Sequence, residues 1–331
     1  MNRTGLVSVF AVAAAGALAL TACETPDDNG NGEEITGGDL TLATGSTGGT
    51  YFPLGGEIAN LWTEDEDMEE VSVSTQATGA SVDNMYLLDS GENELVMAVN
   101  GTAQQAVAGD GDFADEPLEN PDDVRALGNV YPEVMQVSTT EEAGIDSIED
   151  LDGARVEIGP PGSATEGLAQ QILEAYDVEP SETFDSAFGD AATNLGDGQV
   201  DAAFGVLGVP DASLTEVATT NDLEMLDIEG DALDEVLDAD ASLIEHEIPA
   251  DSYEGQDEPN NTVTNWATLY GPSSLSDDLA YDLVSTMYGQ GDDLEHEVAG
   301  EIQLDTALDG LGDVELHPGA ENYYDEEGVL D

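Results

Sequence analysis

Short apolar runs alternate with amphipathic segments along most of this 331-residue chain, and that alternation restricts the folds open to it. In the helical pattern at 168–176, Leu168, Ile172 and Tyr176 lie on one side. Strands that alternate with helices are typical of α/β folds with largely parallel sheets. The roughly 290 residues of 38–331 are enough for two lobes with separate cores. The runs expected to be strands are 40–44, 71–77, 95–100, 124–130, 134–139, 155–158, 201–204, 223–228 and 262–270.

The chain is extremely acidic, with 75 acidic and 3 basic residues and a formal charge of −72. This balance excludes nucleic acid as a partner, because phosphate backbones require cations, and it disfavours anionic membrane surfaces. Disorder is one interpretation of such acidity. The 40% of hydrophobic residues, in periodic patterns, favours instead a folded halophilic protein with a hydrated surface. Because molar salt shortens the Debye length to roughly 3 Å and screens the self-repulsion, we expect the fold to need high salt.

The N-terminus has the features of an export signal. Arg3 precedes an apolar run at 6–19, and a Leu-Thr-Ala-Cys sequence ending at Cys23 resembles a lipobox. The run is short for a membrane span. We expect 1–22 to be a lipoprotein signal peptide, Cys23 to be lipidated, and 23–37 to be a flexible acidic tether; a generic signal peptide is the alternative. The folded part would then lie on the extracytoplasmic face of the cell membrane, attached to it only through the lipid.

Three segments of small residues, 45–50, 78–81 and 160–165, each follow an expected strand and precede an expected helix. In open α/β sheets, ligands bind beyond the carboxyl ends of the strands. Ser163 and Glu166 also have the spacing of a capping box. Ordinary helix capping is therefore the alternative for any one segment, but together the three predict a shared ligand cleft.

The first segment favours a small carboxylate as ligand. It lacks the lysine of a P-loop and the spacing of a dinucleotide-binding loop. A carboxylate needs only backbone N–H groups, hydroxyls and a helix N-terminus. Tyr51, directly after the loop, and Tyr131, where the chain would cross between lobes, are candidate cleft residues. Arg155 is expected to pair with nearby acidic residues.

Catalytic and metal-binding patterns are weak. The chain has no G-x-S-x-G elbow, its three histidines are far apart in sequence, and its single cysteine lies at the expected tether. The spacing of an EF-hand loop is also absent. We therefore expect a binding protein without catalytic residues, metal or cofactor.

Several motifs, taken in order, resemble the TAXI family of solute receptors for TRAP (tripartite ATP-independent periplasmic) transporters, in a halophilic archaeal form. The resemblance covers most of 38–328. Its motifs are ATGSTGGTY at 43–51, QATGASVDN at 76–84, DLDGARV at 150–156, GPPGS at 159–163, DGQVDAAF at 197–204, and HPGA at 317–320 followed by Tyr323 and Tyr324.

This resemblance implies a type II periplasmic-binding-protein fold, with two parallel-sheet lobes joined by hinge strands. Lobe 1 would comprise 38–130 and 255–331, and lobe 2 would comprise 131–254. The lobes would close on glutamate, glutamine or a related carboxylate and deliver it to the membrane subunits of a TRAP permease. A receptor for an ABC permease, a ligand sensor, a structural surface protein and an enzyme on the same fold are the alternatives.

The resemblance also implies ligand contacts from both lobes and a packing and capping role for His317. Three positions depart from the family pattern: Asp152 and Ala154 stand where lysines are frequent, and Ala80 replaces a frequent glycine and puts the identity of the ligand in doubt. The implied contacts are Ser46, Thr47, Gly49, Thr50 and Tyr51 in the first loop, Ser81 in the second, and Gly162, Ser163 and Thr165 in the third.

Overall fold

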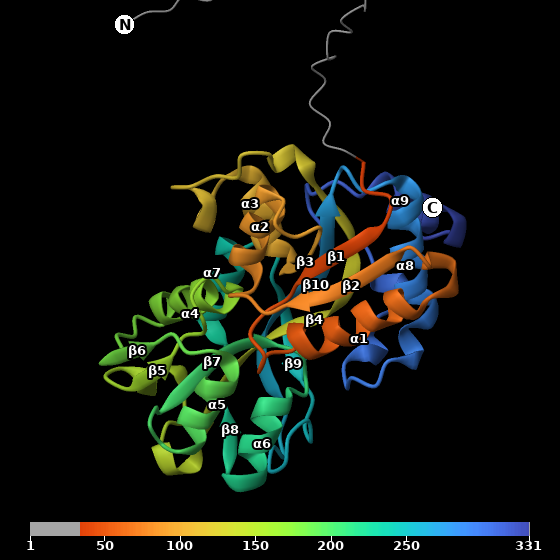
Figure 1. Cartoon of the computed structure of the whole chain (residues 1–331). Coiled ribbons are helices and arrows are strands. Elements are labelled where there is room, and N and C mark those ends of the chain that lie inside the picture. Colours follow the sequence, from red (N-terminus) through yellow and green to blue (C-terminus); the bar gives the residue numbers. More distant parts are fainter. Residues whose placement is uncertain (1–33, 331) are drawn as a thin grey trace, which may run out of the picture. The chain divides into compact units, whose positions relative to one another are not determined.

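The computed structural model describes residues 34–330 (Figure 1). The expected signal peptide 1–22, Cys23 and tether residues 24–33 lie outside the described residues. Among residues 34–330, no helix combines the length and apolar character needed to cross a membrane.

Within the described chain, helices and strands alternate as the sequence predicts. The strands are β1 (Gly38–Ala43), β2 (Val71–Gln76), β3 (Leu95–Val99), β4 (Val124–Thr140), β5 (Arg155–Glu157), β6 (Glu182–Phe184), β7 (Ala202–Leu207), β8 (Leu223–Met225), β9 (Ile244–Ile248) and β10 (Asn260–Pro272). The α-helices are α1 (Tyr51–Glu64), α2 (Ser81–Ser90), α3 (Asn100–Ala108), α4 (Ala164–Ala175), α5 (Phe188–Gly196), α6 (Ala212–Thr220), α7 (Gly230–Ala239), α8 (Asp277–Gln290) and α9 (Pro318–Glu327).

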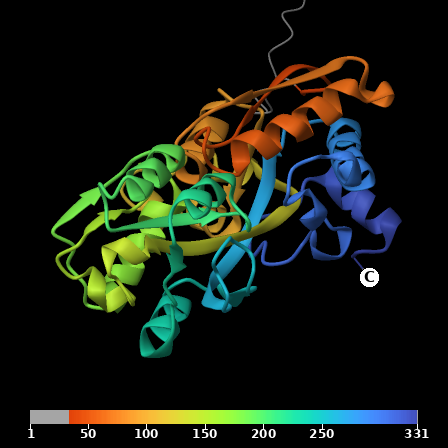
Figure 2. The ribbon, with the colours of Figure 1, turned by 90° about the horizontal axis from the view of Figure 1, so that it is seen from below.

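The ten described strands form one mixed sheet in the order β2-β1-β3-β10-β4-β7-β5-β6, with β8 beside β4 and β9 beside β10. Strands β2, β1 and β3 are parallel to one another, as are β7, β5 and β6. Between these two parallel groups lie β10 and β4, which pair antiparallel with each other and with their outer neighbours. Figure 2 shows the two long strands running between the groups. The parallel groups are therefore two halves of one sheet.

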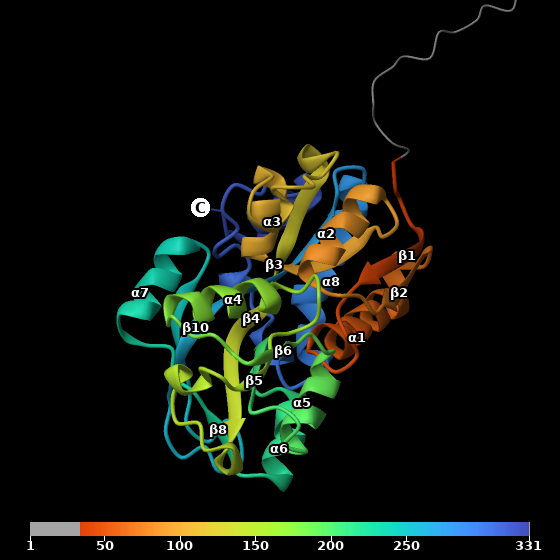
Figure 3. The same ribbon diagram turned by 90° about the vertical axis from the view of Figure 1, so that its left-hand side faces the viewer.

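Helices cover both faces of each half because the strand side chains alternate in direction. In the first half, Leu42 packs in the core beneath α1, α8 and α9, whereas Ala43 packs beneath α2 and α3. In the second half, Phe204 packs with α4 and α7, and Ala203 packs with α5 and α6. Figure 3 shows the α5–α6 pair apart from α4 and α7. Each half of the sheet therefore has one hydrophobic core on each of its two faces.

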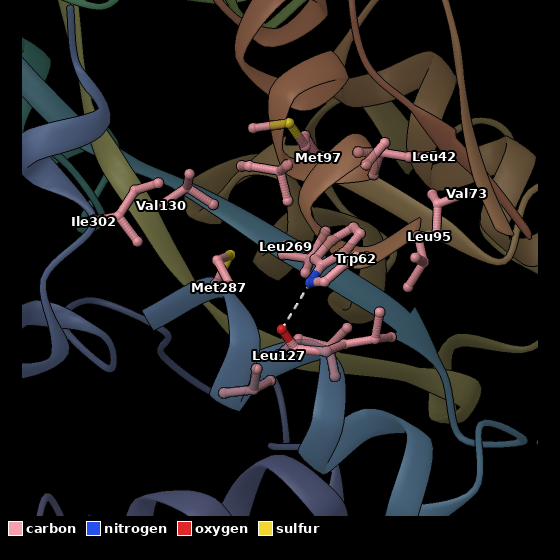
Figure 4. Packing of buried hydrophobic residues seen from close by; sticks show 14 of the residues in the cluster. Leu42, Trp62, Val73, Leu95, Met97, Leu127, Val130, Leu269, Met287 and Ile302 are labelled. Atoms are coloured by element: carbon pink, nitrogen blue, oxygen red, sulfur yellow. Dashed lines mark hydrogen bonds between the residues drawn. The ribbon is translucent and has the colours of Figure 1, made fainter. Parts of the chain in front are cut away.

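Trp62 lies in the first core, with residues of α1, α8 and α9. Its side chain is fully buried, and its indole N–H donates a 2.8 Å hydrogen bond to the carbonyl oxygen of Leu283 in α8 (Figure 4). The buried indole thus has the polar partner that it requires. His317 is also confirmed in its packing and capping role: its Nδ1 accepts from the N–H of Gly319 at 3.1 Å at the start of α9.

Strand β4 corrects one detail of the sequence analysis, which expected two strands with a break at 131–133. The chain stays extended through Tyr131 and Pro132, and Pro132 lies opposite Trp266 of β10. The β4–β10 register shifts close to this position. A proline in a central strand removes a ladder donor and is tolerated at such irregularities. Residues 131–133 are therefore paired within one continuous strand, and the irregularity lies beside them, between Tyr131 and Asn129.

Gly128 in β4 provides a test of this packing. Its φ is +149°, and an added Cβ would overlap the hydroxyls of Tyr288 and Tyr324. Each hydroxyl is held by a 2.6 Å hydrogen bond to a β4 carbonyl. We expect Gly128→Ala to lower the free energy of unfolding by about 2 kcal/mol or more, measured by denaturant unfolding in molar KCl.

The matched control is Gly289→Ala in α8, where an added Cβ meets no atom within 4 Å. Alanine in an open helix position should raise the free energy of unfolding by about 0.5–1 kcal/mol. Equal effects of the two substitutions would contradict the packing described for β4.

Candidate ligand-binding cleft

Three small-residue loops meet around one cavity between the two halves of the sheet. They are the loops that precede α1, α2 and α4, and the cavity volume is about 20 Å³. Such a volume holds about one water molecule. The lining residues are Gly45, Ser46, Gly49, Thr50, Tyr51, Ala80, Ser81, Val99, Glu133, Ser163, Ala164, Thr165, Phe188, Val206 and Leu207.

The N-terminus of α1 forms one wall of this cavity. The helix begins at Tyr51, its N-cap residue is Thr50, and no side chain caps this end. The first N–H groups of a helix have no acceptor within the helix, and they lie at the positive end of its dipole. Gly49, Thr50 and Tyr51 all line the cavity, so this wall suits an anionic group.

The hydroxyls from the other two loops are already engaged in the scaffold. The Ser81 oxygen accepts from the N–H of Val99 at 3.1 Å, and the Thr165 oxygen accepts from the N–H of Val206 at 2.9 Å. Both therefore keep a hydroxyl hydrogen to donate. Ser163 instead donates to the carbonyl of Pro160 at 2.6 Å and accepts from the N–H of Glu166 at 3.3 Å. Its hydroxyl is used as the cap of α4.

Neutral hydrogen bonds cross the cleft from one half to the other. The Val82 N–H donates to the Gly162 carbonyl at 3.0 Å. The Ser213 hydroxyl donates to the carbonyl of Gly48 at 2.7 Å. Likewise, the N–H of Gly208 donates to the Thr50 hydroxyl at 2.9 Å. These contacts hold the two walls together, so a solute larger than water reaches the cavity only when they separate.

Three of the ten residues expected to contact ligand do not line the cavity. Thr47 is exposed. Tyr131 is fully buried and its ring packs edge-on against that of Tyr51 at 6.2 Å between centroids. Gly162 uses its carbonyl to cap α2 from the opposite half. The structure brings the other seven together: Ser46, Gly49, Thr50, Tyr51, Ser81, Ser163 and Thr165.

Glu133, the one acidic side chain that lines the cavity in the described chain, was not among the residues predicted from the sequence. Glu133 lies on β4 with 3% of its surface exposed, and its Oε1 accepts a 2.5 Å hydrogen bond from the Tyr131 hydroxyl. Its Oε2 and the hydroxyl of Tyr51 have no partner among the described residues. An acidic residue inside a buried strand would have indicated this site. Glu133 was not recognised as such a residue because the strand was expected to be interrupted at 131–133.

Burial dominates the electrostatics of Glu133. Loss of hydration raises the pKa of its carboxyl to about 8, and nearby Asp211 adds to this, whereas the hydrogen bond from Tyr131 and the proximity of the Tyr51 hydroxyl oppose it. Burial also raises the pKa of Asp211 to about 6. At neutral pH in the arrangement described, the Glu133 carboxyl is therefore mostly protonated.

The two arginines of the described chain lie away from the cavity. Arg155 pairs with Asp201 at 2.6 Å, which confirms the expected pairing with acidic residues, and Arg125 pairs with Glu315 at 3.3 Å. Within residues 34–330, no three His, Cys, Asp or Glu side chains gather as metal ligands. Neither arginine therefore contributes to the wall of the cavity.

Comparisons with known proteins give a family match and similar solved structures. The family model described as NMT1-like family matches residues 42–328. MatC from Rhodopseudomonas palustris, solved with bound malate, is 12% identical and superposes with a TM-score of 0.52 over 88% of this chain and 99% of MatC. SsuA, the alkanesulfonate-binding protein from Xanthomonas axonopodis pv. citri, bound to MOPS, is 13% identical, with a TM-score of 0.49 over 87% of this chain and 83% of SsuA. The likeness to MatC confirms the expected fold, a mixed α/β periplasmic-binding-protein fold of type II.

The raised pKa of Glu133 predicts a pH-dependent effect of Glu133→Gln on stability. Between pH 4.5 and about 8, the folded chain holds a proton that the unfolded chain releases. This group's contribution to stability therefore falls as pH rises through that window. Relative to the parent chain, Glu133→Gln should gain roughly 3 kcal/mol of unfolding free energy between pH 5 and pH 8, measured by denaturant unfolding in molar KCl.

The control is Glu258→Gln, which changes an exposed carboxylate. The difference in unfolding free energy between Glu258→Gln and the parent chain should stay constant over the same pH range. A Glu133→Gln difference that is equally constant would show that the carboxyl of Glu133 is ionised at low pH in the folded chain.

Proposed function

Since the chain belongs to the NMT1-like family, we propose that it is an extracytoplasmic solute receptor that closes around a small carboxylate. The observation that carries the proposal is the cavity between the halves, where the uncapped N-terminus of α1 faces residues of the opposite half. Backbone N–H groups and the hydroxyls of Ser81 and Thr165 are its available donors for an anion. The malate in MatC is itself a small carboxylate, which agrees with this ligand class.

The more specific proposal is a lipid-anchored TAXI receptor that delivers its solute to a TRAP permease. The motifs from ATGSTGGTY to HPGA support the family assignment, and the lipobox at Cys23 supports the anchor. Glutamate, glutamine and related carboxylates are the solutes that the resemblance suggests. We divide the lobes at 38–130 with 255–331, and 131–254, with β4 and β10 as the hinge strands.

A thermal-shift screen tests the ligand class. The chain from Glu24 contains the whole compact unit 33–331, and it would be screened in molar KCl against glutamate, glutamine, 2-oxoglutarate and malate, with sugars as controls. A ligand at 100 times its Kd adds about 2.7 kcal/mol to stability. We expect a carboxylate, and no sugar, to raise Tm. No shift with any carboxylate in a cooperatively folded sample would refute the ligand class.

Closure itself is tested by Gly48→Ala. An added Cβ at Gly48 would overlap the backbone nitrogen of Gly189 and lie 2.6 Å from its Cα, across the cleft. Because Gly48 does not line the cavity, the substitution obstructs closure and leaves the cavity wall intact. We expect about tenfold weaker affinity for the carboxylate found in the screen, since ligand binding then has to overcome strain in the closed form. Calorimetry measures the affinity.

Gly189→Ala is the matched control, because its Cβ would meet Gly48 Cα at 3.5 Å, an ordinary contact. Its affinity should remain within about threefold of the parent. Unchanged affinity in Gly48→Ala would mean that the solute binds without this approach of the halves.

A further inference from the structure

We propose that Glu133 binds a cationic amino group of the solute, so that the receptor selects amino acids over carboxylates that lack an ammonium group. This inference rests on the receptor function proposed above and names the residue that sets its substrate class. It concerns a side chain to which neither the motifs nor the family match assigns a role.

The first argument is the unused hydrogen-bonding capacity of Glu133. Its side chain lines the cavity and is almost fully buried, yet only Oε1 has a partner, the Tyr131 hydroxyl. Oε2 and the neighbouring Tyr51 hydroxyl are both buried without partners in the described chain. Buried polar atoms in native proteins are usually hydrogen-bonded. An ammonium group supplies three donors, enough for both oxygens.

The second argument compares Glu133 with another buried glutamate, Glu157. Glu157 is fully buried, and its Oε1 accepts from the Ser186 hydroxyl at 2.9 Å and from the side-chain amide of Asn194 at 2.8 Å. Its Oε2 accepts from the N–H of Ser186 at 3.1 Å. The chain thus satisfies both oxygens of a buried carboxyl that does not line the cavity, and leaves an oxygen free on the one that does.

The third argument is the placement of opposite charges in one cavity. Tyr51 connects the anion-binding part of the cavity with the acidic part, because its backbone begins α1 and its ring carries a hydroxyl beside Glu133. The helix end favours the carboxylate of a solute, and Glu133 provides a counter-charge for an adjacent ammonium group. An α-amino acid carries these two charges one carbon apart, whereas a keto acid offers only the first.

An opposite role is available to Glu133, since a protonated carboxyl can donate a hydrogen bond to the solute's carboxylate. Binding an ammonium group requires the carboxyl to release its proton, so affinity for an amino acid should rise with pH. The donor role predicts the opposite trend. The groups facing Glu133 are Tyr131 of β4, Tyr51 of α1, and Asp211 before α6. Between pH 7 and 8 both tyrosines stay protonated and Asp211, with its pKa of about 6, is mostly ionised.

The experiment uses pairs of acids that differ only at the amino-bearing carbon. Calorimetry in molar KCl on the chain from Glu24 would compare glutamate with 2-oxoglutarate, and alanine with pyruvate. We expect the amino acid of at least one pair to bind about 30-fold tighter than its keto acid, the effect of a buried charge pair. In Glu133→Gln that preference should disappear, because glutamine keeps a donor and an acceptor but has no charge. The affinity of the parent chain for the amino acid should rise about fivefold from pH 7 to pH 8, and the affinity of Glu133→Gln for it should stay constant.

Glu157→Gln is the matched control and should keep the preference, provided that its melting curve shows a folded protein. If Glu133→Gln does not fold, Tyr51→Phe replaces it. We expect this variant to bind the amino acid about fivefold more weakly than the parent does and to bind the keto acid equally well.

The outcomes separate the two proposals. Keto acids that bind as well as their amino acids, a preference that survives in Glu133→Gln, or affinity that falls with pH would each overturn the role of Glu133 and leave the carboxylate receptor standing. If no acid of either kind binds to the folded chain, both proposals fail.

Discussion

The antiparallel pairing of β4 with β10 is the contact on which the rest of the structure depends. Each strand pairs with an outer parallel group on its other side, so the two halves of the sheet are joined through these two strands. The bulge near Pro132 lies within this pair, and Glu133 follows it. Bulges re-aim side chains next to functional sites. The strands that join the halves therefore also carry the acidic group of the cavity.

Much of this arrangement could be predicted from local patterns, and the failures have physical reasons. The loops before α1, α2 and α4 were expected to share a cleft because ligands bind beyond the carboxyl ends of the strands in open α/β sheets. The short strands β6 and β9 were missed, since three residues in one and the charged sequence IEHEI in the other give no apolar periodicity. The chain was expected to cross between lobes at Tyr131, so the strand was divided there, whereas Tyr131 and Pro132 pair with β10 and continue β4. Glu133 was missed for the same reason.

The acidic composition shapes how this chain can recognise a solute. Both described arginines are committed to carboxylates and carbonyls at the surface. The cavity consequently relies on dipoles and hydroxyls for negative charge, and these act at short range and with direction. Among 75 acidic residues, the informative ones are the few in the interior. Their partners distinguish them: Glu157 is fully bonded within its own half, whereas Glu133 has an oxygen free beside the cavity.

The hydrogen bonds across the cleft, from Val82 to Gly162, from Ser213 to Gly48 and from Gly208 to Thr50, involve no charged group. A latch built from ion pairs would loosen as brine concentrates, because mobile ions screen exposed charges. A latch built from amides and hydroxyls is indifferent to that screening. Salt screening therefore leaves these three bonds unchanged, and the further contact across the cleft, from the Thr50 hydroxyl to the Asp211 carboxylate at 3.5 Å, is buried away from mobile ions.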